Sequence, residues 1–247
     1  MSLPARQLIV NADDFGRAPG IVAGVLAARQ RGILTSASLM VRWPAAEGAA
    51  RGSREDPGMS VGLHVDLGEW VHRPDGWAPV YEVCDLADEV AVESEVEGQL
   101  VAFRALIGRE PTHLDSHQHV HRQGAPSTVL RRLARALHVP LRGLSEAVQH
   151  LGDFYGQTGT ADRLHGNITP DGLVAILDRL PPGVTELACH PGDGSDRLVP
   201  TRRNAASSWR RCATRRSATR LSRVESPSHP SPPWFGLEPT RPLGRAA

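Results

Sequence analysis

Lysine and long apolar runs are absent from this 247-residue sequence, and cysteine and aromatic residues are scarce. All 28 basic residues are therefore arginine, which is typical of a coding region very rich in G and C. Cys84, Cys189 and Cys212 form no CxxC pair, which argues against a disulfide framework and against a thiolate zinc site. A membrane helix needs roughly 18 to 20 consecutive apolar residues, and no stretch approaches that length. With strand-like residues already at Leu8, we expect a cytoplasmic protein with no membrane partner.

Two kinds of sequence follow one another in the chain. Hydrophobic residues make up 40% of it, enough for one sizeable α/β core. Residues 1–196 hold 17 arginines and 25 acidic residues, whereas residues 197–247 hold 11 arginines and 2 acidic residues. The second segment is rich in Arg, Ser and Pro and lacks apolar periodicity. We predict a catalytic domain over 1–196 and a basic tail over 197–247, disordered or poorly packed.

Strand patterns alternate with helix patterns through the first 190 residues. The expected strands cover 7–11, 35–41, 59–67, 112–117 and 184–189, and the expected helices cover 20–30, 94–108, 126–137 and 170–180. Ser94 and Glu97 have the form of a capping box for the second of these helices. Such alternation favours a mostly parallel sheet or a barrel of βα units, in which chemistry gathers at the C-terminal ends of the strands.

Polar clusters stand at the predicted ends of four strands. They are Asp13 with Asp14, His64 with Asp66, Asp115 with His117, His119 and His121, and finally His190. One carboxylate and two imidazoles would supply three ligands to a divalent metal and leave a position open. Adjacent carboxylates on an extended strand point opposite ways, so one is expected to bind metal and the other to act as a general base. His190 would protonate a leaving amine, and Asp115 would orient the ring of His117.

Four ordered strings, IVNADDFG (9–16), GLH (62–64), PTHLDSHQHVH (111–121) and CHPG (189–192), resemble the YdjC-like carbohydrate deacetylases. That family includes chitooligosaccharide deacetylases and deacetylases associated with hopanoid biosynthesis, and the resemblance covers about residues 6–196. It implies an α/β fold, a distorted (β/α) barrel of the polysaccharide-deacetylase type, commonly dimeric. It also implies that Asp13 is the base, that Asp14, His64 and His117 hold Mg²⁺ or Zn²⁺, and that His190 lies near the leaving group.

Substrate contacts are predicted less sharply by the residues. His119 and His121 line the cleft or cap a loop. Trp70 and Trp77, in a Gly/Pro-rich loop after His64, stack on a sugar ring, pack in the core or anchor that loop. Arg142 contacts the substrate or the carboxylates of the metal site, unless it is an ordinary surface arginine.

The tail departs from the family pattern, because nothing after about Leu198 resembles it. Residues 209–220, written in GC-rich codons and read in another frame, give an ordinary helical phrase. We therefore expect that a frameshift replaced the true ending and left the barrel incomplete at its C-terminus; resequencing codons 195–215 tests this. The alternative is a genuine basic segment that binds an anionic partner. Its few aromatics argue against nucleic-acid stacking, so no nucleic-acid partner is expected.

The sequence thus predicts a metal-dependent hydrolase that removes the acetyl group from an N-acetylated amino sugar, a small-molecule substrate, with a homodimer possible by resemblance. A metal-dependent phosphoesterase is a second hypothesis, although no Gly-rich phosphate cradle is present. A sugar-binding remnant without catalytic activity is a third.

Overall fold

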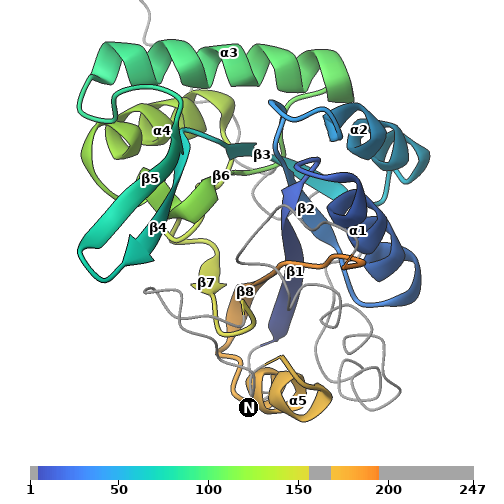
Figure 1. Cartoon of the computed structure of the whole chain (residues 1–247). Coiled ribbons are helices and arrows are strands. Elements are labelled where there is room, and N and C mark those ends of the chain that lie inside the picture. The colour runs from blue at the N-terminus through green and yellow to red at the C-terminus, as the bar shows by residue number, and fades with distance from the viewer. Residues whose placement is uncertain (1–4, 156–167, 195–247) are drawn as a thin grey trace, which may run out of the picture.

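The computed structural model describes residues 5–155 and 168–194, and the basic tail predicted for 197–247 lies outside them. Six strands form one parallel sheet in the order β6-β3-β2-β1-β8-β7 (Figure 1). They are β1 (Arg6–Phe15), β2 (Ser36–Leu39), β3 (Ser60–Val65), β6 (Leu114–Ser116), β7 (Gln149–Leu151) and β8 (Gly183–Cys189). The sheet is curled and carries helices, so the predicted α/β fold with parallel βα units is confirmed.

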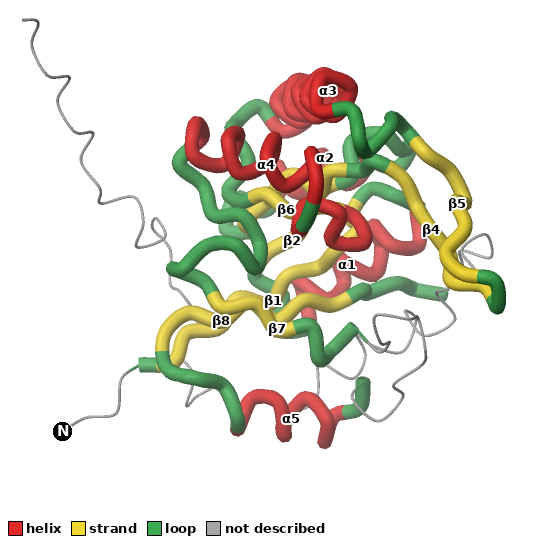
Figure 2. The backbone as a smooth tube through the Cα atoms, turned by 90° about the vertical axis from the view of Figure 1, so that its left-hand side faces the viewer, coloured by secondary structure: helices red, strands yellow, loops and turns green. Residues whose placement is uncertain are grey.

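Within residues 5–155 and 168–194, five α-helices connect the strands. They are α1 (Pro19–Arg31), α2 (Ala46–Glu55), α3 (Glu89–Ile107), α4 (Gly124–Leu137) and α5 (Pro170–Asp178). The first four pack each against the next in chain order. The fifth lies at the far end of the molecule from α3, as both views show (Figures 1 and 2). None of the helices in 5–155 and 168–194 combines the length and the apolar character that crossing a membrane requires.

The two faces of the sheet carry different side chains, because successive residues of a strand point to opposite sides. In β3, Val61, Leu63 and Val65 belong to the hydrophobic core that the helices complete. Between them, Gly62 and His64 face the other side of the sheet. The same alternation in the neighbouring strands lines that second face with polar residues near the strand ends, which is where the sequence predicts the chemistry.

The third helix begins earlier than predicted. Its N-cap is Asp88, whose side chain accepts hydrogen bonds from the backbone N–H groups of Val90 and Ala91 at 2.9 and 3.2 Å. The expected capping box at Ser94 is therefore wrong, because the Asp88 carboxylate already satisfies the free N–H groups at the true start of the helix, upstream of Ser94. The predicted end is confirmed: Gly108 takes φ +78° and closes the helix.

Five elements have no counterpart in the sequence-based prediction. They are α2, β7, the short helix η1 (His117–Arg122) and an antiparallel hairpin of β4 (Gly68–Arg73) and β5 (Gly76–Glu82). The hairpin corrects the expectation of a loop around Trp70 and Trp77, which lie on its two strands. A Pro-Asp-Gly turn signal was present there, and Gly76 takes φ +119° at that turn.

Candidate metal centre and active site

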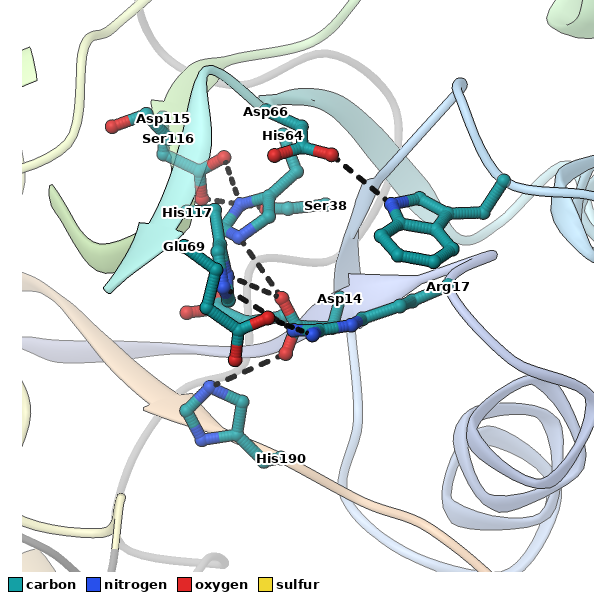
Figure 3. A network of polar contacts seen from close by, with 12 residues as sticks. Asp14, Arg17, Ser38, His64, Asp66, Glu69, Asp115, Ser116, His117 and His190 are labelled. Carbon is teal, nitrogen blue, oxygen red and sulfur yellow. Dashed lines mark hydrogen bonds and ion pairs between the residues drawn. The ribbon is translucent and has the colours of Figure 1, made fainter. Parts of the chain in front are cut away.

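Asp14, His64 and His117 converge at the C-terminal end of the sheet, as predicted. One ligand atom from each lies within 4.8 Å of the other two, and all three residues are buried. Nδ1 of His117 lies 3.0 Å from Oδ1 of Asp14, and Nε2 of His64 lies 3.3 Å from the same oxygen (Figure 3). Residues 14, 64 and 117 come from the ends of three different strands, so the sheet assembles the cluster from distant parts of the chain.

A distortion of β1 brings Asp14 into this cluster beside Asp13. The pairing of β1 with β2 shifts register between Ala12 and Phe15, and Asp14 takes φ +59°, a left-handed conformation. The expectation that two adjacent carboxylates must point opposite ways is therefore wrong here. A non-glycine residue in this region is held there at some cost, and such residues gather at functional sites.

A carboxylate behind His64 fixes the orientation of its ring. Nδ1 of His64 lies 2.8 Å from Oδ1 of Asp115, to which it donates a hydrogen bond, and this contact turns Nε2 toward Asp14. The sequence predicted that Asp115 would orient a histidine ring, and it does. The ring is that of His64, however, and the predicted partner, His117, was wrong. The parallel register explains the difference: His64 and Asp115 are direct partners across β3 and β6.

His117 has a different neighbour. Nη1 of Arg17 lies 3.2 Å from its Nε2, and the other end of the Arg17 guanidinium pairs with Glu69 of the hairpin. The Arg17 guanidinium also lies 5.3 Å from the centre of the Trp43 ring. Glu69 and Arg17 were not predicted, because their contact joins segments that the sequence separates by 52 positions.

The donor set fits a divalent metal ion. Burial lowers the pKa of His117 to about 3, so the ring is neutral at physiological pH, the form in which an imidazole can bind a metal. Two imidazoles and one carboxylate match the three protein ligands of catalytic zinc sites, and the same set accepts other divalent ions. A metal ion would therefore be held by Asp14, His64 and His117.

Asp13, by contrast, is surrounded by hydrogen-bond donors. Arg142 donates to both of its oxygens at 2.7 and 2.8 Å, Asn11 donates to Oδ1 at 2.9 Å, and the Tyr155 hydroxyl donates to Oδ2 at 3.1 Å. Burial alone would raise the pKa of Asp13, but the Arg142 guanidinium beside it holds that pKa below its usual range. The carboxylate is therefore ionised in the resting site.

Arg142 contacts the carboxylates of the site, one of the contacts that the sequence left open. It lies 2.6 Å from both Asp115 and Glu186 and is buried, 3% exposed, so it is not a surface arginine. A bridge between Leu141 and Leu114 continues the sheet beyond β6 and sets its backbone in place. His121, also fully buried, supports it further, because its Nε2 lies 2.9 Å from the Arg142 carbonyl oxygen.

His190, the residue directly after β8, also lies at the site. Its Nε2 lies 3.9 Å from Oδ2 of Asp14, and burial lowers its pKa to about 4. A side chain at Gly24 of α1 would meet Gly192 at 2.5 Å, so only glycine lets the segment after His190 pack this closely on the helix. This close approach anchors the segment that carries His190.

The remaining predicted substrate residues differ in their exposure to solvent. His119 is half-buried and packs on His150 and Tyr155, with ring centres 5.4 and 5.7 Å apart. Trp70 is half-buried on β4, whereas Trp77 is 54% exposed on β5. Neither His150 nor Tyr155 was predicted, because no periodic or motif signal marks the segment after Arg142.

Comparison with known proteins supplies an independent view. Residues 7–221 match the model of the YdjC-like protein family, a range that continues past the expected domain end at 196. A carbohydrate deacetylase of Geobacillus stearothermophilus is 35% identical over 204 residues, which cover 75% of this chain and 79% of that protein. A chitooligosaccharide deacetylase of Salmonella paratyphi B is 33% identical over 207 residues, 75% of this chain and 81% of its own length.

Solved structures agree on the fold. A protein of Enterococcus faecalis V583 described as a candidate cellobiose-phosphate cleavage protein aligns with a TM-score of 0.69 at 22% identity, over 88% of this chain and 94% of its own. A family 4 carbohydrate esterase from Streptomyces lividans aligns with a TM-score of 0.53 at 16% identity, over 89% and 90%. These likenesses confirm the predicted polysaccharide-deacetylase type of fold. The family match and the sequence identities together show that this chain belongs to the YdjC-like protein family.

Proposed function

We propose that this protein is a metal-dependent carbohydrate deacetylase that hydrolyses the N-acetyl group of an amino sugar. The observation that carries the proposal is the placement of two neighbouring carboxylates in opposite surroundings at one site. Asp14 lies among imidazole nitrogens that suit a metal, and Asp13 lies beside it as an ionised carboxylate that suits a general base. The names of the relatives, carbohydrate deacetylase and chitooligosaccharide deacetylase, support the same reaction class.

The chain's own residues account for the proton movements. When bound, the divalent ion supplies Lewis-acid polarisation of the acetamide carbonyl. Asp13 takes a proton from the water that attacks this carbonyl carbon, and the C–N bond then breaks as the amine accepts a proton. His190 is neutral in the resting site because burial lowers its pKa to about 4. The proton that His190 gives to the amine must therefore reach His190 during the reaction. Its source is the water that Asp13 has deprotonated.

For the identity of the ion, we favour zinc or another transition metal over magnesium. Two of the three proposed ligands are imidazoles, whereas magnesium prefers oxygen ligands and retains its waters. The carboxylate oxygen of Asp14 would be the third protein ligand for zinc and for magnesium alike. Calorimetric titration of the metal-free protein with Zn²⁺ and with Mg²⁺ tests this preference directly.

For the substrate, we propose a small N-acetylglucosamine oligomer or glycoconjugate. Trp70 and Trp77 present rings of the kind that stack on sugar faces, and His119 stands with His150 and Tyr155 beside Asp13. A cytoplasmic location, a homodimer and the absence of a nucleic-acid partner remain predictions from the sequence.

The decisive experiment measures acetate released from N-acetylglucosamine oligomers, with and without a chelator. We expect metal-dependent release that Asp13→Asn abolishes and that Glu110→Gln leaves unchanged, because Glu110 forms only an exposed ion pair with Arg104. Phosphate release from esters without acetate release would favour the phosphoesterase hypothesis. Metal binding without turnover of any substrate would indicate a sugar-binding remnant.

A further inference from the structure

Ser38, Gly62 and His113 lie level with one another on three neighbouring strands. Ser38 of β2 pairs directly with Gly62 of β3. The parallel register of β3 with β6 pairs Leu63 with Leu114, so His113, the residue just before β6, comes level with Gly62. The backbones at His113 and Ser38 are therefore two strand spacings apart, roughly 10 Å. Only a long side chain that crosses β3 can join them.

The ring of His113 crosses β3 over Gly62. Nε2 of His113 lies 3.0 Å from the Ser38 hydroxyl oxygen, and Nδ1 lies 2.9 Å from the Thr112 hydroxyl oxygen. A Cβ atom at Gly62 would lie 2.4 to 2.5 Å from three atoms of the His113 ring, closer than real Cβ atoms approach. Gly62 lies in a regular strand and does not have a positive φ, so the space for the ring, and not the backbone conformation, requires a glycine here.

The Ser38 hydroxyl connects His113 to the metal centre. It donates its one hydrogen to Oδ2 of Asp115 at 2.7 Å and accepts a hydrogen bond from Asn11 at 2.8 Å. A hydroxyl has one hydrogen and two lone pairs, so the third contact, from Nε2 of His113, completes its capacity. These three contacts fix the hydroxyl in the orientation that meets Asp115. Asp115 in turn accepts a hydrogen bond at 2.8 Å from Nδ1 of His64 (Figure 3).

We propose that His113 is a positioning residue for the metal centre. It fixes the Ser38 hydroxyl, and through Asp115 that hydroxyl fixes the ring of His64. The inference rests on the proposed role of His64 as a metal ligand. Hydrogen-bonded partners behind a ligating imidazole set the orientation of its ring, and their loss typically lowers metal affinity about 10- to 100-fold. Gly62 has a matching task, because its missing side chain leaves the path open for the His113 ring.

The first test compares two substitutions of His113 by calorimetric titration of the metal-free protein with Zn²⁺. His113→Leu keeps an apolar side chain over Gly62 but cannot donate to Ser38, so Zn²⁺ affinity should fall about 10-fold, the lower end of the range for an outer partner. His113→Gln keeps an N–H donor near the position of Nε2 and should stay within about threefold of wild type. Equal affinities in the two variants, or an unchanged affinity in His113→Leu, would overturn the inference.

Urea unfolding of the same metal-free variants separates positioning from stability. A positioning role requires that the folded His113→Leu protein binds Zn²⁺ more weakly. A lower free energy of unfolding with unchanged Zn²⁺ affinity would leave His113 a structural role only, which contradicts the proposal.

The second test is a double-mutant cycle that asks whether Gly62 acts through His113. Gly62→Ala places a methyl group where the ring crosses, and the ring is the end of a side chain that can swing aside. Zn²⁺ affinity should therefore fall about as far as in His113→Leu. In a His113→Ala background the same methyl group has no ring to displace, so Gly62→Ala should change the affinity by less than about twofold. Losses that simply add in the double variant would show that the two residues act separately and would refute the inference.

Wild-type protein titrated in parallel distinguishes failure of this inference from failure of the proposed function. If the wild type bound no Zn²⁺, the metal centre would be refuted, and the inference with it. Wild-type binding with unchanged affinities in the variants would refute the inference alone. If the variants bind Zn²⁺ as expected while the wild type releases no acetate from N-acetylglucosamine oligomers, the inference is supported and the deacetylase proposal fails.

Discussion

Asp13 and Asp14 are neighbours in the chain, yet they belong to two differently built halves of the site. The base half surrounds Asp13 with Arg142, Asn11 and Tyr155, all of which donate hydrogen bonds to it. The metal half sets Asp14 among the ring nitrogens of His64 and His117. Identical side chains therefore acquire different tasks from their surroundings, and the left-handed backbone at Asp14 is what places one carboxylate in each half.

The halves are joined beneath the site by a short polar network. The Ser38 hydroxyl accepts a hydrogen bond from Asn11, which also donates to Asp13, and donates at 2.7 Å to Asp115, which orients His64. The two carboxylates thus differ in their immediate partners while sharing one rigid support. Separate loss of metal binding and of base catalysis should therefore be observable by changing one residue at a time.

The largest expected effect distinguishes the two halves by whether a substitution lowers the affinity for Zn²⁺. Asp14→Asn should weaken Zn²⁺ binding and lower acetate release roughly a thousandfold or more, since it removes the only charged ligand of the three. Asp13→Asn should lose a comparable amount of activity yet bind Zn²⁺ within a fewfold of wild type. Calorimetric titration of both variants makes the measurement. If Asp13→Asn also lost the metal, the division of labour between the two carboxylates would be refuted.

A second effect concerns the stability of the base half. Arg142→Met should lower the free energy of unfolding by about 3 to 5 kcal/mol, because it leaves buried carboxylates without their cationic partner. Urea denaturation of the metal-free protein measures this loss. The matched control is Arg104→Met, which breaks an exposed ion pair and should cost about 0 to 1 kcal/mol. Equal losses in the two variants would show that the Arg142 cluster does not hold the base half together.

Much of this site follows from the sequence because parallel strands deliver their last residues to one edge. The strand pattern alone predicted that clusters holding an Asp and two His would meet at one edge, and the resemblance to the YdjC-like family singled out Asp14, His64 and His117, which the structure brings together. The YdjC-like strings gave the family and the fold, both of which are confirmed.

Other parts of the site depend on contacts that no local pattern encodes. The left-handed turn at Asp14 arises from the register shift between β1 and β2, and Arg17 meets Glu69 only because a hairpin folds back over the strand ends. Tyr155 follows a three-residue strand in a stretch without periodicity. Tertiary structure alone gives these residues their roles, since each is paired with a partner at least 50 positions away or held by a neighbouring strand.

The last expected effect is a loss of stability in acid, and it reaches both halves. Burial lowers the pKa of His121, beneath Arg142, to about 4 and that of His117, in the metal half, to about 3. The unfolded chain takes up protons at these rings near pH 6.5, whereas the folded chain does so only below about pH 4, so the unfolded state binds more protons between these values. Stability should therefore be full above pH 6.5 and fall as the pH drops toward 4, by roughly 3 kcal/mol for His121 alone.

His121 is the better residue for testing this expectation, because it is fully buried and is not one of the proposed ligands. Nδ1 of its ring lies 2.7 Å from the Ser116 hydroxyl and Nε2 lies 2.9 Å from the Arg142 carbonyl oxygen, so a second ring hydrogen would force the Ser116 hydroxyl to turn away. Urea unfolding of the metal-free protein at pH 7, 6 and 5 measures the dependence, and His121→Gln should flatten it while lowering stability at pH 7. If wild type and variant had the same slope, acid sensitivity would have to come from the metal half, and the two halves would then differ in their response to pH as well as in their chemistry.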